Sequence, residues 1–379
     1  LLWNVFWLMR SLTINIDIRI KYRILHYAFS ILCLICYMYY YQIGMIYYIF
    51  WTFPITGDIL TVSIIISLAF ASQISTVKIV GVFLFRNRLK ELMVKYRNFD
   101  STLIPNSRYS NAVLSTLKTV KRRALIFWCT FCSTSALYLL GPLLLPGRNL
   151  PENSLIAVGF TPVDTYPNYE ITYAVCTLAG VFATAGIANV TVLLIVLAGY
   201  LEAHLLALKN EMDCLWSDAL DYDKNNQTLI KQKYVKEMLS VQVKKHIKLL
   251  ECHKIVKELF NEVIALEFLF TTIAMCAMLL GGLEDTHMQI PYTISQLVVD
   301  TILGQRLIDS SIAFQEAVYR SGWENFNASN MKSLQLILQC SQKTLTLTAG
   351  NVTYLSYICF TTIVRFVYSA YATLRQAMD

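Results

Sequence analysis

A single arginine, Arg365, interrupts an apolar stretch near the end of the sequence, and polar residues flank it at helical spacing. A charged side chain in hydrocarbon costs on the order of several kcal/mol, so such residues usually face a bundle interior or a water-filled cavity. Every fourth residue of a helix returns to nearly the same face. The pattern therefore predicts a pore-lining helix whose lining face comprises Thr361, Arg365, Ser369, Thr373 and Ala377.

Two alternatives account for Arg365 without a pore. One is an ion pair with Asp300, which lies near the middle of another apolar segment. The other is snorkelling, in which the long side chain reaches the membrane surface while its aliphatic part stays in hydrocarbon. The sequence leaves all three interpretations open.

The residue types that most often carry catalysis or bind metals follow no known pattern here. The five histidines are scattered, and no zinc-protease motif, nucleophile elbow or phosphate-binding glycine loop occurs. Two C-x-x-C spacings, Cys33 with Cys36 and Cys129 with Cys132, lie in apolar segments without charged or histidine partners. Such cysteines are typical of buried thiols. We therefore expect no enzyme activity, no metal site and no cofactor.

The composition is that of an integral membrane protein. Hydrophobic residues make up 56% and charged residues 15% of 379 positions, whereas an average soluble domain is about 25% charged. Apolar runs near 20 residues can cross roughly 30 Å of hydrocarbon as helices. We predict an all-α integral membrane protein with seven transmembrane helices, at about 24–50, 59–85, 124–145, 171–200, 260–283 and 290–312, with the seventh around Arg365.

The basic residues orient these helices, because Lys and Arg in short loops stay on the cytoplasmic side. They cluster between the second and third spans and between the fourth and fifth, and are nearly absent from 50–58, 145–170 and 281–295. The N-terminus is therefore predicted to be cytoplasmic and the C-terminus extracellular, the reverse of a G-protein-coupled receptor. The formal charge of +7 lies largely in the cytoplasmic loops, so we expect contact with anionic membrane lipid and no nucleic-acid binding.

The segment 201–258 carries apolar residues at helical spacing outside the predicted bilayer. It is either a solvated helical pair or a platform on which subunits assemble. The second interpretation is considered because apolar positions outside a membrane need a partner. The sequence does not decide between the two.

The C-terminal part of the chain resembles the signature of insect odorant receptors. The resemblance extends over essentially the whole chain and is strongest in 319–376; two further segments, 304–323 and 161–176, are similar to the family's exit from the sixth span and its entry into the fourth. The signature residues are Tyr319, Trp323, Leu334, Leu338, Gln342, Leu347, Ala349, Gly350, Phe360, Tyr368 and Ser369.

This resemblance implies a seven-transmembrane odorant-tuning subunit that partners the odorant-receptor co-receptor in a heterotetramer. The assembly would be a ligand-gated, non-selective cation channel in the plasma membrane of olfactory sensory neuron dendrites. The family's last helix is split into a cytoplasmic half, here about 330–344, and a pore-lining second half, here about 350–377. Its gate would lie near Thr373 and Ala377, and a lysine is common in the family where Arg365 stands.

The implied regions are six. The first three are a cytoplasmic or interfacial N-terminus at 1–23, transmembrane helices one to four with the odorant-pocket helices at 24–200, and cytoplasmic helical extensions that form an anchor region at 201–258. The other three are transmembrane helices five and six at 259–312, a cytoplasmic anchor with the first half of helix seven at 313–347, and the pore-lining half of helix seven with a short extracellular tail at 348–379. We expect the N-terminus to be processed or incomplete, because no Met opens it.

The resemblance also implies an odorant pocket in the outer half of the membrane, between the second, third, fourth and sixth spans. Its apolar walls, aromatic rings and few hydroxyls suit a small neutral volatile odorant. The ligand-binding residues it implies are Leu68, Ala71, Ser72, Cys132, Ser135, Tyr138, Leu139, Tyr173, Thr177, Tyr292 and Gln296.

Three other classes of protein are weighed against this one. A metabotropic seven-helix receptor would need basic loops of the opposite phase, and a transporter would show internal repeats or broken helices at mid-membrane. A gustatory-type chemoreceptor channel of the same superfamily is the nearest alternative. Its usual final-span signature ends in Gln-Phe, whereas this sequence continues from Thr353 and Tyr354 without that pair.

Overall fold

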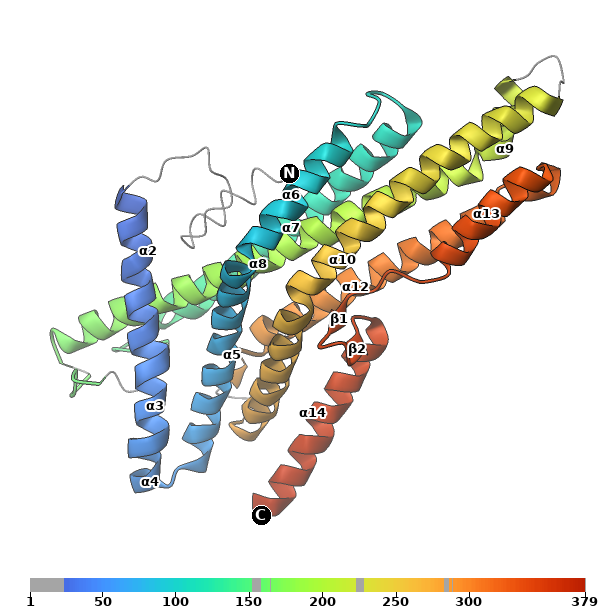
Figure 1. Ribbon diagram of the computed structural model, residues 1–379. Coiled ribbons are helices and arrows are strands. Elements are labelled where there is room, and N and C mark those ends of the chain that lie inside the picture. Colours follow the sequence, from blue (N-terminus) through green and yellow to red (C-terminus); the bar gives the residue numbers. More distant parts are fainter. Residues whose placement is uncertain are drawn as a thin grey trace.

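The computed structural model describes residues 24–151, 158–163, 165–222, 228–282, 286–287 and 289–378, so the N-terminal region at 1–23 lies outside the described residues. Within these ranges the chain is helical apart from loops and one short hairpin, which confirms the all-helical prediction. Figure 1 shows long helices packed lengthwise into one elongated body.

Two π-helical stretches interrupt the first helical segment. α2 (Ile24–Tyr37) passes into the π-helical η1 (Met38–Gly44), then α3 (Met45–Tyr47), the π-helical η2 (Tyr48–Thr52) and α4 (Phe53–Thr56). π-helical turns are rare in proteins, and those that do occur often lie at functional sites. η1 is the part of this segment that reaches the cavity described below, through Tyr41.

Side-chain caps begin the next two long helices. The Asp58 carboxylate accepts hydrogen bonds from the amides of Leu60 and Thr61 at the start of α5 (Ile59–Leu84), and the Ser107 hydroxyl accepts one from Ser110 at the start of α7 (Arg108–Leu140). Each cap satisfies amides that a helix start leaves without an intrahelical partner. Between these helices lies α6 (Arg86–Asp100), and the 3-10 turn η3 (Gly141–Leu144) follows α7.

α8 (Asn168–Asp213) is the central helix, because α2, α5, α7 and α12 all pack against it. Small residues allow this close packing. A Cβ atom added at Gly186 would lie 2.2 Å from the Ser75 hydroxyl oxygen, and one at Gly180 would lie 2.8 Å from a methyl carbon of Leu139. Both glycines therefore let α8 approach its neighbours closely, and Gly180 does so at the wall of the cavity described below.

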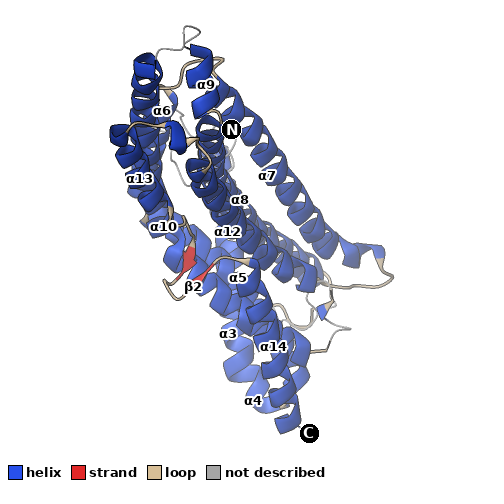
Figure 2. Cartoon of the chain, turned by 90° about the vertical axis from the view of Figure 1, so that its right-hand side faces the viewer, coloured by secondary structure: helices blue, strands red, loops and turns tan. Residues whose placement is uncertain are grey.

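Two helices extend far beyond the predicted membrane spans at 171–200 and 260–283. α8 continues to Asp213, and α10 (Thr228–Leu280) begins well before the fifth predicted span; α9 (Leu215–Tyr222) lies between them, and residues 223–227 lie outside the described part. Figure 2 shows α6, α9 and α13 at one end of the molecule, with α4 and the C-terminus at the other.

The end that holds α6 and α9 is packed by aromatic rings. Tyr96 and Tyr200 stack with centroids 3.8 Å apart, and the Tyr200 hydroxyl donates a 2.7 Å hydrogen bond to Asp100. Burial raises the pKa of the Asp100 carboxyl, and the hydrogen bond from Tyr200 counteracts part of that shift.

The C-terminal third comprises α12 (Gln289–Tyr319), the 3-10 turn η4 (Trp323–Asn325), α13 (Ala328–Ser341) and α14 (Tyr357–Met378). Between α13 and α14, β1 (Thr348–Ala349) pairs antiparallel with β2 (Thr353–Tyr354). Asn261 of α10 holds this hairpin: its carbonyl oxygen accepts from the Gly350 amide at 2.9 Å, and its side-chain oxygen accepts from the Thr348 hydroxyl at 2.7 Å.

Six described helical segments are long and apolar enough to cross a membrane. α12 is not among them, because polar residues such as Asp300, Arg306 and Asp309 lower its mean hydropathy. It nevertheless packs against α8, α10 and α14. The count of seven spans requires α12 as a seventh and stays a prediction, as does the orientation of the termini. The six are Ala28–Thr56, Ile59–Leu84, Arg108–Leu144, Asn168–Asp213, Thr228–Leu280 and Tyr357–Gln376.

Candidate ligand-binding site

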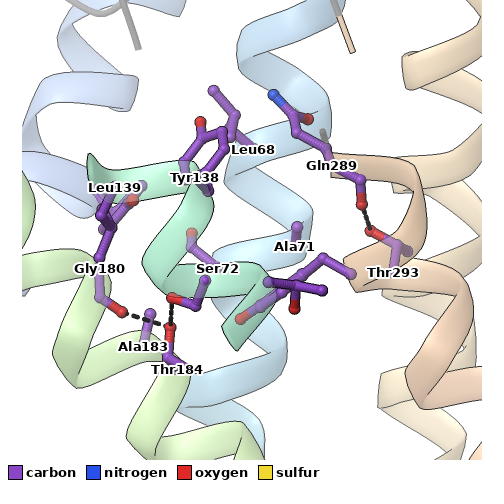
Figure 3. Close-up of a pocket in the computed structure, with 14 residues that line it drawn as sticks. Leu68, Ala71, Ser72, Tyr138, Leu139, Gly180, Ala183, Thr184, Gln289 and Thr293 are labelled. Carbon is purple, nitrogen blue, oxygen red and sulfur yellow. Dashed lines mark hydrogen bonds between the residues drawn. The ribbon is translucent and has the colours of Figure 1, made fainter. Parts of the chain in front are cut away.

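A cavity lies where η1, α5, α7, α8 and α12 come together (Figure 3). It leaves about 70 Å³ open to the centre of a water-sized sphere, several times the roughly 10–15 Å³ that one water molecule needs. The space therefore suits a compact organic molecule. It is lined by Tyr41, Leu68, Ala71, Ser72, Thr134, Ser135, Tyr138, Leu139, Gly180, Ala183, Thr184, Gln289, Tyr292 and Thr293.

Seven of the eleven expected ligand-binding residues belong to this lining. They come from three helices that lie far apart in sequence, and only the tertiary packing brings them together. From α5 they are Leu68, Ala71 and Ser72, from α7 Ser135, Tyr138 and Leu139, and from α12 Tyr292.

The other four expected residues do not line the cavity. Tyr173 donates a hydrogen bond to the Leu139 carbonyl oxygen at 2.5 Å, and Thr177 lies one turn further along α8. Cys132 packs against the hydrophobic core. Gln296 is fully buried on α12, and its amide has no hydrogen-bond partner among the described residues. These four residues therefore lie outside this lining, and their part in ligand binding stays a prediction.

Seven lining residues were missed by the sequence reasoning. On α12 the sequence held a signal that could have found two of them. Gln289 lies seven positions and Thr293 three positions before Gln296, so all three residues share one face of the helix. On α8 the signal is weaker, because small residues occur along much of its length. The missed residues are Tyr41, Thr134, Gly180, Ala183, Thr184, Gln289 and Thr293.

The polar groups of the lining are tied to one another or to the backbone. The hydroxyl oxygens of Ser135 and Thr184 are 2.6 Å apart, and Thr184 donates to the Gly180 carbonyl oxygen at 2.8 Å. Figure 3 shows Gln289 reaching from α12 toward Leu68 of α5. The aromatic wall is ordered as well, since the ring of Tyr292 stacks on Phe131 with centroids 4.5 Å apart.

No acidic, basic or histidine side chain is part of the described lining. A charged ligand would lose its hydration without gaining an ion pair, at a cost of several kcal/mol. The cavity therefore favours a neutral ligand. Among the described residues, His, Cys, Asp and Glu side chains form no group of three that could hold a metal ion.

The polar stripe of α14 lies apart from this cavity. Thr361, Arg365, Ser369 and Thr373 are all exposed on the surface of the single chain, and the side chain of Ala377 lies outside the described part. Apolar residues of α14 are exposed too, such as Ile358 at 77% and Phe366 at 61%. Most of this helix is therefore exposed on the single chain.

The structure does not support an ion pair between Arg365 and Asp300. Arg365 is exposed and takes part in none of the ion pairs found among the described residues. Asp300 is fully buried and interacts instead with Glu267 and Lys78, which lie on α10 and α5. α14 therefore carries its arginine on a face that α12 does not cover.

α12 connects the cavity with the start of α14. Its first turns supply Gln289, Tyr292 and Thr293 to the lining. Further along, Gly304 lies so close to Leu355 that an added Cβ would be 2.2 Å from the Leu355 carbonyl oxygen. At 1.5 Å per residue, the two contacts lie about 17–22 Å apart along one rigid helix.

Comparisons with known proteins agree with this architecture. The family model described as 7tm Odorant receptor matches residues 61–368. The fold is similar to that of the insect olfactory receptor OR5 from Machilis hrabei, with a TM-score of 0.77 at 16% identity, over 99% of this chain and 97% of that one. A structure of the same receptor in complex with eugenol aligns with a TM-score of 0.74 at 14% identity, over 98% of each chain. No curated protein sequence gives a significant match.

Proposed function

Since the chain belongs to the 7tm odorant receptor family, we propose that it is the odorant-binding subunit of a heteromeric, ligand-gated, non-selective cation channel. The observation that carries the proposal is the uncharged cavity at the junction of five helical segments. Its aromatic and apolar walls supply dispersion contacts, and its few hydroxyl and amide groups orient one polar group of a ligand. Family membership favours odorant reception over gustatory or metabotropic reception.

The proposed ligand is a small neutral volatile. Its binding residues are the predicted ones that line the cavity together with Gln289, Thr293 and Thr184. The similar receptor that was solved with eugenol supports a small organic ligand. Charged odorants are disfavoured because no described lining residue offers a counter-charge.

The proposed channel is a heterotetramer with the odorant-receptor co-receptor, in the plasma membrane of olfactory sensory neurons. In it, α13 is the cytoplasmic half of the last span and α14 is the pore-lining half. This assignment is supported by the exposed polar stripe of α14, which has no partner within the described chain to cover it. The long ends of α8, α10 and α12 with α9 and α13 form the proposed anchor region, where subunits assemble and contact anionic lipid.

The proposed gating route runs along α12. A ligand shifts gating only by its differential affinity for the open and closed states. A ligand held by Gln289, Tyr292 and Thr293 would bias the position of α12, and the close contact of Gly304 with Leu355 would carry that bias to the start of α14.

The proposal is tested by whole-cell recording from cells that express this chain with an insect co-receptor, challenged with a panel of neutral volatiles. Cells with the co-receptor alone are the control. We expect a fast cation current that needs both chains. Silence across the panel, with both proteins detected at the surface, would contradict the proposed function.

A further inference from the structure

We propose that Asp300 of α12 is a buried proton-binding site, held as a neutral carboxylic acid that donates its proton to the carboxylate of Glu267 on α10. The inference goes beyond the proposed function and does not depend on which ligand the protein binds. It follows from the number of charges and of hydrogen-bond donors in one buried cluster, to which α5, α8, α10 and α12 each contribute a side chain.

The register of two helices places Asp300 at the level of Lys78. Near the start of α12, the side chain of Gln289 is joined to Ser67 of α5 by a 2.9 Å hydrogen bond. Asp300 and Lys78 each lie eleven positions, about three helical turns, further along the same two helices. In agreement with this register, the charges of Lys78 and Glu267 both act on the Asp300 carboxyl group.

The cluster contains two acidic groups but only one basic group. The ammonium nitrogen of Lys78 lies 2.7 Å from a carboxylate oxygen of Glu267, so these two charges neutralise each other. The next charged residue along α12, Arg306, pairs instead with Glu202 of α8 at 3.6 Å. An ionised Asp300 would therefore leave one negative charge buried without a counter-charge of its own, which is costly in the interior of a protein.

Hydrogen-bond donors that could stabilise an Asp300 carboxylate are missing as well. Asp300 is fully buried, and neither of its oxygens has a hydrogen-bond partner among the described residues. Two polar side chains lie one helical turn from the cluster, Gln296 before Asp300 and Thr271 after Glu267. Both are buried, and the described part of the chain offers them no partner either. They therefore do not donate to Asp300.

A single proton removes both deficits. The carboxyl group of Asp300 lies within hydrogen-bonding reach of Glu267, and two carboxylates this close repel each other unless one carries a proton. The ion pair with Lys78 keeps Glu267 ionised, so the proton resides on Asp300. The Asp300 hydroxyl then donates to Glu267, and the cluster has no net charge.

The place of Asp300 on α12 makes it a positioning residue. It lies between Tyr292, which lines the cavity, and Gly304, which touches Leu355 at the start of α14. The proton on Asp300 fastens α12 to α10 between these two contacts. The hydrogen bond to Glu267 is charge-assisted, because its acceptor is ionised, and such bonds are stronger than those between neutral groups.

The direct test is infrared spectroscopy of the purified full chain in lipid at neutral pH. A protonated carboxyl group has a C=O stretching band that ionised carboxylates lack. We expect a band of this kind to be lost in Asp300→Asn and kept in the control Glu262→Gln, because Glu262 is exposed on α10. Identical carboxylic-acid bands in wild type and Asp300→Asn would show that Asp300 is ionised and would overturn the inference, whatever the outcome of the recordings that test the proposed function.

Two variants of nearly unchanged shape test which residue carries the proton. Asp300→Asn keeps a donor for Glu267 and should reach the cell surface at close to the wild-type level. Glu267→Gln removes the counter-charge of Lys78 and should lose most of the surface protein. Surface biotinylation measures both. A loss in Asp300→Asn as large as that in Glu267→Gln would show that Asp300 acts as an anion and would overturn the inference.

Discussion

Lys78 and Glu267 form an ion pair in the core of the protein, with the ammonium nitrogen 2.7 Å from a carboxylate oxygen and both side chains almost fully buried. The ammonium group also donates to the Thr191 hydroxyl at 2.6 Å, so the pair joins α5, α8 and α10. Asp300 of α12 interacts with the same group. Four helices, three of which also line the cavity, therefore meet at one buried charge cluster.

Lys78→Met should reduce the amount of folded protein at the cell surface strongly. Removing one partner of a buried ion pair typically costs about 3–5 kcal/mol, because the other charge stays buried and unpaired. Surface biotinylation measures the effect. The double variant Lys78→Met with Glu267→Met should recover part of the loss, and normal surface levels of the single variant would contradict the structural role of the pair.

Exchanging the charges of Asp300 and Arg365 should not restore function. The two residues do not pair in the structure, because Asp300 is fully buried whereas Arg365 is exposed on α14. Asp300→Arg should fail in surface expression, and adding Arg365→Asp should leave that failure unchanged. Recovery of current in the double variant would show that the two residues meet in a functional state.

Gly304→Ala should lower the maximal current with little change in ligand sensitivity. The new methyl group would collide with the Cβ and carbonyl oxygen of Leu355, both 2.2 Å away, so α12 and the start of α14 would have to separate. Whole-cell recording with surface quantification separates gating from expression. Gly141→Ala, where an added Cβ meets nothing within 4 Å, is the matched control.

Tyr292→Ala should raise the half-maximal odorant concentration by about tenfold, because it removes an aromatic wall that stacks on Phe131. Tyr292→Phe keeps the ring and should lose much less. A dose–response series on cells with the co-receptor measures both. Unchanged sensitivity and maximal current in the alanine variant would exclude this residue from ligand binding and from gating.

Thr373→Asp should raise the permeability of the channel to calcium relative to sodium, if α14 lines the pore near its outer end. Acidic rings favour cations by direct attraction. Reversal potentials in mixed solutions measure the ratio. Thr373→Asn changes the side chain without adding charge and is the control. Equal reversal potentials for all three forms would place Thr373 away from the ion path.

The sequence by itself determined the class of fold and much of the cavity. Apolar runs long enough to cross a bilayer predict helices in any arrangement, because backbone groups in hydrocarbon must be paired internally. The family resemblance pointed to Leu68, Ala71 and Ser72, and to Ser135, Tyr138 and Leu139, all of which line the cavity. Residues three or four apart share a helix face whatever surrounds the helix.

Only the tertiary structure decided which face meets which neighbour. Gln289 and Gln296 lie on the same side of α12, yet one lines the cavity and the other is buried in the core. Likewise, no spacing in the sequence relates Asp300 to Glu267, which α10 brings beside it. The periodicity of apolar residues describes one helix at a time. How deeply a side chain is buried, and which residue it contacts, depends on where the helices cross, and the packing of all the helices together sets those crossings.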